Sequence, residues 1–327
     1  SSHIHDKVLK GEEKMSKTVL VTGGAGFIGS HLCEALINKN FSVICIDNLG
    51  TGKLLNLNSI LKKKNFRFIK HDVTEPVKIP VRINYVFHLS SYASPTYYQK
   101  YSIDTLMTNS AGTNNVLKIA RKNNAKFLLA STSEVYGDPK IHPQKEEYWG
   151  NVNPVGVRSC YDEAKRFAEA LTMEYARKFR TNVRIIRIFN TYGPRLQKDD
   201  GRVISNFIYQ ALNNLPITIY GDGTQTRSFC YVSDMVNGML KAMFMPETRN
   251  QIINIGNPDE FMIKEAALII KNITNSKSKI VHKPLPEDDP VRRKPDITKA
   301  KNILKWSPEI KLREGLVKTI EWFKNEK

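Results

Sequence analysis

A glycine-rich turn near the N-terminus constrains this chain more than any other feature. The apolar run 19–21 ends at Gly23, Gly26 and Gly29, spaced G-x-x-G-x-x-G, and apolar residues at helical spacing follow over 32–37. This order predicts a strand, a tight turn and a helix. Glycine suits such a turn because it adopts unusual φ values and lets a phosphate approach the backbone. The first helical turn then offers free N–H groups to a pyrophosphate.

An acidic residue completes the nucleotide-binding pattern. A second apolar run, 41–46, ends at Asp47. An acid at the tip of the second strand accepts hydrogen bonds from both adenosine ribose hydroxyls and repels a 2′-phosphate. The sequence therefore predicts NAD rather than NADP, although three spaced glycines alone also occur in other α/β turns.

Strand and helix patterns alternate up to about residue 190. We expect strands at 18–22, 41–46, 66–70, 84–89, 126–131 and 182–188, and helices that include 109–123 and 161–179. This alternation predicts an α/β fold with a Rossmann-type doubly wound parallel sheet. We expect an NAD-binding domain over 16–190, to which later segments return. A smaller α+β lobe that binds the substrate is expected over 191–327, and a tag or disordered tail over 1–15.

Composition narrows the class of protein. The chain has 327 residues, is 41% hydrophobic and carries a net charge of +18, with its lysines scattered rather than gathered on one helix face. We expect a solvated basic surface that steers an anionic substrate, and no nucleic-acid partner. No apolar run reaches the 18 residues that a membrane helix needs, and the four cysteines have no metal-site spacing. We therefore expect a cytoplasmic protein with neither a membrane segment nor a metal, although a lost membrane anchor would leave no trace.

Polar residues follow several of the expected strands. Asp72 follows the third strand and could meet an adenine amino group or cap a helix, and the sequence leaves both open. Small residues follow the fourth strand over 89–95, and a cluster of hydroxyls with Glu134 follows the fifth over 130–137. Because ligands bind at the carboxyl ends of parallel strands, we expect these residues at one site.

Tyr161 and Lys165 form the clearest catalytic pair. They are four residues apart, so they share one face of the expected helix. A phenol is a poor base at neutral pH, and we expect the ammonium and the positive nicotinamide ring to favour the phenolate. The pair can then act as general base and later as general acid. Such a pair by itself is common by chance, but here it follows the glycine turn and the hydroxyl cluster in order.

Together these motifs resemble the extended short-chain dehydrogenase/reductases that act on nucleotide sugars. Among them, the chain is most similar to the decarboxylases of UDP-glucuronate, over residues 17–323. The most specific stretches are 23–32, 130–139, 142–143, 148–154, 160–165, 188–195, 201–208 and 224–229.

The resemblance implies roles for single residues. It makes Thr132, Tyr161 and Lys165 the reductase triad, Glu134 an additional acid or base, and Arg227 a neighbour of the sugar carboxylate or of the developing enolate. Ser133 stands where the related 4,6-dehydratases carry Asp, which fits a reaction whose leaving group is carbon dioxide.

Two positions depart from the family. Ala164 replaces a usual Gly, which costs a helix nothing. Tyr92 replaces a usual Pro, and we expect it at the sugar pocket, where it would alter substrate fit.

Motifs and resemblance together give the full set of expected contacts. The NAD-binding residues are Gly23, Gly26, Phe27, Ile28, Gly29, Asp47, Asn48, Thr51, Gly52, Asp72, Val73, Leu89, Ser91, Thr108, Ala130, Tyr161 and Lys165. The residues expected to bind the UDP-sugar are Ser94, Thr132, Glu134, Asn190, Arg202, Val203, Asn206, Tyr220, Arg227 and Arg292.

The implied reaction converts UDP-glucuronate to UDP-xylose. Oxidation at C4 gives a ketone β to the C6 carboxylate, carbon dioxide leaves, and C5 is reprotonated by Glu134 or by a water that it orients. Hydride then returns to C4, so that NAD is recycled. The alternatives are an oxidative decarboxylase that releases a UDP-4-keto-pentose and NADH, a UDP-hexose 4-epimerase, and an NAD-binding regulator without catalysis. The family is usually dimeric, and the helices 109–123 and 161–179 are the expected interface.

Overall fold

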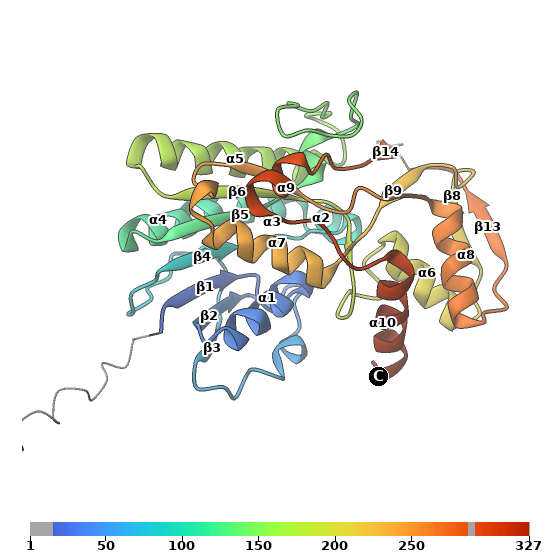
Figure 1. Cartoon of the computed structure of the whole chain (residues 1–327), viewed down its shortest axis with the longest axis horizontal. Helices are drawn as coiled ribbons and strands as arrows, with labels where there is room; N and C mark the ends of the chain where they lie inside the picture. Colours follow the sequence, from blue (N-terminus) through green and yellow to red (C-terminus); the bar gives the residue numbers. More distant parts are fainter. Residues whose placement is uncertain (1–15, 287–291, 327) are drawn as a thin grey trace, which may run out of the picture.

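A seven-stranded parallel sheet forms the centre of the molecule (Figure 1). The structure is a computed structural model and describes residues 16–286 and 292–326. The strand order is β11-β6-β5-β4-β1-β2-β3, with every neighbouring pair parallel. The strands are β1 (Thr18–Thr22), β2 (Ser42–Asp47), β3 (Phe66–Lys70), β4 (Tyr85–His88), β5 (Lys126–Thr132), β6 (Val183–Ile188) and β11 (Ile252–Ile255). The six predicted strands and the doubly wound fold are confirmed.

Helices cover both faces of the sheet, as Figure 1 shows. Alternate residues of β1 explain the two layers, because successive side chains of a strand point to opposite faces. Val19 and Val21 belong to the core that contains α1 (Phe27–Asn38) and α7 (Val232–Phe244). Leu20 belongs to the opposite core, which contains α4 (Thr113–Asn123) and α5 (Ser159–Phe179).

The helix predicted over 109–123 is interrupted at its start. The structure has α3 (Ser102–Met107), one π-helical turn (Thr108–Gly112) and then α4. Within this turn Asn109 donates from Nδ2 to the carbonyl of Thr105 and to Ser91 Oγ, each at 2.9 Å. Turns of this kind are frequent at functional sites. Here the turn brings Asn109 to the loop after β4.

A second lobe lies beside the sheet, on the right of Figure 1. It contains the strand pair β13-β8 and the three-stranded sheet β12-β9-β14, which pack with α6, α8 and α10. Its elements are α6 (Val203–Leu212), β8 (Ile217–Tyr220), β9 (Thr226–Ser228), β12 (Glu260–Met262), α8 (Ile263–Thr274), β13 (Ile280–Lys283), β14 (Arg292–Arg293) and α10 (Leu312–Asn325).

The remaining elements are short. They are the helical turns η1 (Leu54–Leu57), η3 (Ser133–Tyr136) and η4 (Pro246–Thr248), the helices α2 (Pro95–Lys100) and α9 (Thr298–Leu304), and the short pair β7 (Thr191–Tyr192) and β10 (Cys230–Tyr231). Because β11 and α7 come after residue 190 and pack into the sheet layer, the later half of the chain contributes to both parts. The predicted tail at 1–15 lies outside the described residues.

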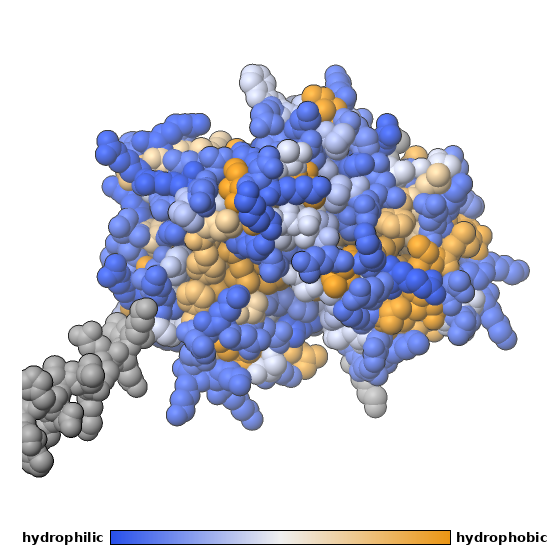
Figure 2. Space-filling view, in the orientation of Figure 1, coloured by the Kyte–Doolittle hydropathy of each residue, from blue (hydrophilic) through white to orange (hydrophobic). Residues whose placement is uncertain are grey.

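Hydrophilic residues cover most of the face shown in Figure 2, with hydrophobic areas over the sheet layer and over the second lobe. None of the helices within 16–286 and 292–326 combines the length and the hydropathy that a membrane span requires.

Candidate active site

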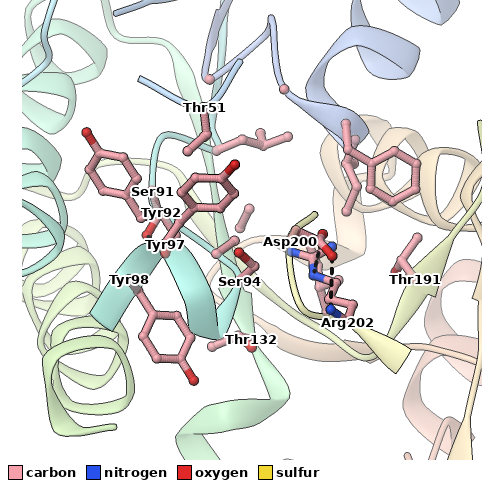
Figure 3. A pocket seen from close by; sticks show the side chains of 18 of the residues that line it. Thr51, Ser91, Tyr92, Ser94, Tyr97, Tyr98, Thr132, Thr191, Asp200 and Arg202 are labelled. Atoms are coloured by element: carbon pink, nitrogen blue, oxygen red, sulfur yellow. Dashed lines mark hydrogen bonds and ion pairs between the residues drawn. The ribbon is translucent and has the colours of Figure 1, made fainter. Parts of the chain in front are cut away.

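The carboxyl ends of the parallel strands open into a cavity of about 390 Å³. The strand order reverses at β1, which has β2 on one side and β4 on the other, and open α/β sheets bind ligands at such a point. Residues of the second lobe close the cavity from the other side. Figure 3 shows Tyr97 and Tyr98 on one side of the cavity and Asp200 and Arg202 on the other.

The glycine turn is as tight as the sequence predicts, but the three glycines are needed for different reasons. Only Gly23 has a positive φ, +72°. At Gly29 an added Cβ would lie 2.2 Å from the carbonyl oxygen of Gly23, so this glycine is needed for close packing of helix on turn. Gly26 has an ordinary φ of −77°, and its added Cβ would lie 3.3 Å from that same oxygen. The expectation of unusual φ values therefore holds for Gly23 alone.

Asp47 lies at the end of β2 and faces the cavity. Its Oδ2 accepts from the N–H of Ala25 at 3.0 Å, and its Oδ1 accepts from the N–H of Leu49 at 2.8 Å. Burial raises the pKa of Asp47, and these two N–H groups oppose that shift. Each carboxylate oxygen keeps a second lone pair, so the side chain can still accept from a ribose hydroxyl.

Asp72 does not cap a helix, because no helix begins directly after it among the described residues, and its contact with adenine stays a prediction. Its Oδ1 accepts from the backbone N–H and the hydroxyl of Thr74, at 2.9 and 2.8 Å, which closes a turn rather than the first turn of a helix. Its Oδ2 accepts from Asn48 Nδ2 at 3.2 Å. Both side chains line the cavity, beside Asp47.

The residues present fit NAD. A glycine turn without room for side chains leads into the N-terminus of α1, and Asp47 faces the same cavity at the end of the next strand. All of the predicted NAD-binding residues line this cavity: Gly23, Gly26, Phe27, Ile28, Gly29, Asp47, Asn48, Thr51, Gly52, Asp72, Val73, Leu89, Ser91, Thr108, Ala130, Tyr161 and Lys165.

Tyr161 lies at the bottom of the cavity, in the first turn of α5, and is 5% exposed. Its ring stacks on that of Tyr98, with 4.7 Å between centroids and 3° between planes. Burial raises the pKa of Tyr161, and a hydrogen bond with Thr132 opposes this. Nζ of Lys165 lies 5.9 Å from the ring centroid, and the lowering of the Tyr161 pKa by this cation together with a bound nicotinamide stays a prediction.

Lys165 is fixed beneath the site. Its Nζ donates to the carbonyl of Ala130 at 2.9 Å, and burial lowers its pKa to about 8, with Glu169 opposing that shift. His88, one strand away, is held between Thr22 and Thr113 at 2.7 and 3.0 Å. Burial, and next the charge of Lys165, lower the pKa of His88 to about 3, so this imidazole is neutral.

Glu134 is surrounded by arginines. Its Oε2 accepts from Arg158 at 2.7 Å, and its Oε1 lies 3.2 Å from Nη1 of Arg293. Burial alone would raise the pKa of Glu134, but Arg293, Arg158 and Arg227 hold it at about 2. The side chain is therefore ionised and is an acceptor rather than a proton donor.

Most of the predicted substrate residues line the cavity, namely Ser94, Thr132, Glu134, Asn190, Arg202, Val203 and Arg227. Ser94 is 4% exposed, and its Oγ has no hydrogen-bond partner among the described residues. A buried hydroxyl that faces a cavity in this state is suited to a ligand's polar group.

Three predicted substrate residues do not line the cavity: Asn206, Tyr220 and Arg292. Asn206 lies one helical turn beyond the cavity-lining start of α6, and Tyr220 is 42% exposed at the end of β8. Arg292 is exposed and pairs with Thr226, whereas Arg293 pairs with Arg227 and is buried. Because paired residues of neighbouring strands share a face, Arg293 rather than Arg292 points into the cavity.

Sequence reasoning missed Arg158, Arg293 and Tyr98. Arg293 had a signal, the Arg-Arg pair itself, since a strand buries only one of two adjacent side chains. Arg158 comes just before α5, where nothing in the sequence pairs it with Glu134. Tyr98 is one of several tyrosines after the fourth strand, and only the fold brings its ring onto Tyr161.

Tyr92 lines the cavity beside the loop after β2, near Asn48. An added Cβ on Gly50 would be 2.8 Å from its hydroxyl, and that hydroxyl hydrogen-bonds Asn48. Its ring stacks on that of Tyr101, with centroids 4.9 Å apart. Tyr92 therefore joins the loop after β4 to the loop after β2.

Comparison with known proteins assigns the chain to a family. Residues 19–256 match the NAD dependent epimerase/dehydratase family. The chain is 53% identical over 299 residues to UDP-glucuronic acid decarboxylase 5 of Arabidopsis thaliana, covering 91% of this chain and 86% of that protein. It is 49% identical over 314 residues to UDP-glucuronic acid decarboxylase 1 of Danio rerio, covering 96% and 74%.

A solved structure resembles this chain in fold. The UDP-glucuronic acid 4-epimerase from Bacillus cereus, in complex with UDP-glucuronic acid and NAD, has a TM-score of 0.84 and 30% identity. The superposition covers 94% of this chain and 99% of that one.

Proposed function

The chain belongs to the NAD dependent epimerase/dehydratase family, and within it we propose a UDP-glucuronate decarboxylase that forms UDP-xylose. The observation that carries this proposal is the cluster of Arg158, Arg227 and Arg293 around Glu134, next to Tyr161. A guanidinium group can bind a carboxylate through two parallel hydrogen bonds, so this cluster suits a sugar that carries a carboxylate. The two UDP-glucuronic acid decarboxylases that are 49% and 53% identical to this chain support the same activity.

NAD, when bound, takes a hydride from the sugar and later returns it. The glycine turn and the start of α1 would hold its pyrophosphate, and Asp47 its adenosine ribose. Lys165, fixed by the Ala130 carbonyl, would hold the nicotinamide ribose and add positive charge near Tyr161.

Tyr161 acts on the sugar's C4 hydroxyl. Its phenol is buried and forms a hydrogen bond with Thr132 at the end of β5. The two neighbouring hydroxyls can therefore donate a hydrogen bond to the sugar and accept one from it. We propose that Tyr161 removes the C4 proton and later restores it, while Thr132 holds the C4 oxygen. The ring of Tyr98 fixes the orientation of the phenol by stacking on it.

The arginine cluster acts on the carboxylate end of the sugar. Loss of carbon dioxide from a β-keto acid leaves an enolate, and Arg227, Arg158 and Arg293 can stabilise that charge. With its pKa held at about 2, Glu134 is ionised and has no proton to give. We therefore propose that it orients a water, which delivers the proton to C5.

The likeness to a 4-epimerase bound to UDP-glucuronate keeps a second candidate open. An epimerase needs the Tyr161, Lys165 and Thr132 arrangement but must retain the carboxylate. Incubation with UDP-glucuronate distinguishes the two, because only a decarboxylase releases carbon dioxide. Simultaneous absorbance at the NADH band separates the recycling enzyme, which builds up no NADH, from the oxidative one, which forms one NADH per turnover.

We further propose that the chain works as a homodimer. The exposed apolar side chains Ile103, Leu106 and Met107 of α3 lie beside α5, which adds Phe167. These four side chains are 73%, 40%, 47% and 50% exposed. The sequence predicts an interface of 109–123 and 161–179. Among the described residues, the exposed apolar positions agree with 161–179, which lies within α5, and favour α3 over 109–123.

The division of labour between the two parts is also a proposal. The sheet layer would bind NAD, and the lobe built around α6, β9 and β14 would bind the UDP-sugar through Arg202, Val203 and Arg227. The cytoplasmic location predicted from the sequence stays a prediction, which microscopy of the tagged full-length protein would test.

A further inference from the structure

A second cavity of about 240 Å³ lies next to the first. We call it the side cavity. Its walls are residues 137–138 and 151–153 together with Glu134, Arg158 and Asp162. Glu134 and Arg158 line both cavities, so they form the partition between them.

One end of the side cavity is lined by solvent-exposed residues, and the other end is buried. Asp138, Asn151 and Asn153 are exposed, and the walls there are joined by a hydrogen bond from the Asp138 N–H to the Asn151 carbonyl at 3.0 Å. At the other end Asp162 is only 6% exposed, and its Oδ1 has no hydrogen-bond partner among the described residues. A polar space of this size has room for several waters that could bond to such an oxygen.

The proposed reaction needs a proton from solvent, and the main cavity does not supply a path for it. Decarboxylation breaks the bond between C5 and C6, and the electron pair stays on C5 as part of an enolate. A new C–H bond at C5 then uses one proton, while the proton taken from the C4 hydroxyl returns to it. Each turnover therefore takes one proton from solvent. NAD and the UDP-sugar would fill the main cavity and exclude water from its mouth.

We propose that the side cavity is the path by which this proton enters, with Asp162 as its relay. This inference rests on the proposed decarboxylase activity. In the relay, the carboxyl group of Asp162 gives its proton, through water held by Glu134, to the enolate carbon C5. Asp162 then regains a proton from solvent through the side cavity. The electron pair moves from the enolate into the new C–H bond, so that charge and atoms balance.

The electrostatics of Asp162 agree with this role. Burial, and next the negative charge of Glu134, raise its pKa to about 7, while Arg158 and Arg293 oppose that shift and Glu163 adds to it. The charge of Asp162 also acts on the phenol of Tyr98, on α2, and on its own helix on the thiol of Cys160 and the phenol of Tyr161. Asp162 can therefore hold a proton near neutral pH, whereas Glu134, between its arginines, cannot.

The test compares the wild-type enzyme with Asp162→Asn in the conversion of UDP-glucuronate. We expect Asp162→Asn to lower kcat by about tenfold or more, to leave KM within about twofold, and to enlarge the solvent deuterium isotope effect on kcat. In the wild type, kcat should fall as the pH rises through about 7, because the relay must be protonated, and the variant should lose this dependence. Glu174→Gln, an exposed carboxylate on the same helix, is the matched control and should behave as wild type.

Two further variants keep the test independent of any structural damage. Asp162→Ala should be slow, and added formate should restore part of its activity, since this small acid can enter the side cavity and take the place of the missing carboxyl group. Val152→Phe should narrow that cavity and enlarge the isotope effect without removing a titratable group.

The outcomes separate this inference from the proposed function. If the wild type releases no carbon dioxide, the proposed function fails. If it does, the relay is overturned by an Asp162→Asn variant with unchanged kcat and pH dependence. The relay is also overturned by two results together. In the first, Asp162→Asn is slow but keeps the wild-type isotope effect. In the second, formate does not restore the activity of Asp162→Ala.

Discussion

At the scale of single residues, the site depends most on one hydroxyl. Tyr161→Phe should reduce turnover of UDP-glucuronate at least about a hundredfold, because the phenol is the only group proposed to move the C4 proton. Binding of NAD should stay within about threefold, since the stacking on Tyr98 does not need the hydroxyl. Tyr175→Phe on the same helix is the control, measured by the same kinetics and by NAD titration. Near-normal turnover in Tyr161→Phe would remove Tyr161 from the mechanism.

Tyr92 makes a different prediction at the same scale. Its hydroxyl ties the loop after β4 to Asn48, one of the predicted NAD-binding residues. Tyr92→Phe should speed the dissociation of NADH by about three- to tenfold, the value of one hydrogen bond, and leave KM for the UDP-sugar unchanged. Stopped-flow fluorescence of bound NADH measures this, with the exposed Tyr209→Phe as control. A changed sugar KM with unchanged NADH release would place Tyr92 at the sugar pocket.

The sequence places a residue at the cavity where a motif fixes its position along the chain. Tyr161, Lys165, Thr132 and Asp47 follow strand ends or share a helix face, and each lines the cavity. The sequence did not place Arg293 there rather than Arg292, because this depends on which residue of a two-residue strand pairs with Arg227. The high pKa of Tyr161 was also out of reach, since it comes from complete burial in the folded chain.

At the scale of elements, the turn between β1 and α1 makes the sharpest prediction. An alanine at Gly29 must push against the carbonyl oxygen of Gly23, 2.2 Å away, whereas one at Gly26 meets it only at 3.3 Å. Gly29→Ala should therefore lower the free energy of unfolding by about 2 kcal/mol or more and weaken NAD binding. Gly26→Ala should lose NAD affinity with little loss of stability. Urea denaturation and NAD titration of both variants measure this, and equal stabilities would contradict the packing argument.

Elements with a strict period were predictable, and those shaped by tertiary contacts were not. The six strands agree with the predicted ranges to within one residue at each end. The π-helical turn before α4 could not be predicted, because it exists where Asn109 reaches Ser91 on another loop. The strand β11, four residues long, joins the sheet only because β6 offers an open edge.

At the scale of the whole molecule, the apolar faces of α3 and α5 predict assembly. Ile103→Asp combined with Phe167→Asp should convert a dimer to a monomer, because two buried charges would face apolar partners. Sedimentation at micromolar concentration measures this. Leu268→Asp, at an equally exposed apolar position on α8, is the control and should leave the dimer intact. A double variant that remains dimeric would place the interface elsewhere.

The proposed reaction also makes a prediction for the molecule as a whole, and proton NMR of the reaction in D2O tests it most directly. With UDP-glucuronate and a trace of NAD, we predict UDP-xylose that keeps its original hydrogen at C4 and carries one deuterium at C5, with no build-up of NADH. That pattern requires hydride to leave and return within one active site while the proton at C5 comes from solvent. A UDP-4-keto-pentose with stoichiometric NADH, or a C4 epimer that retains its carboxylate, would contradict it.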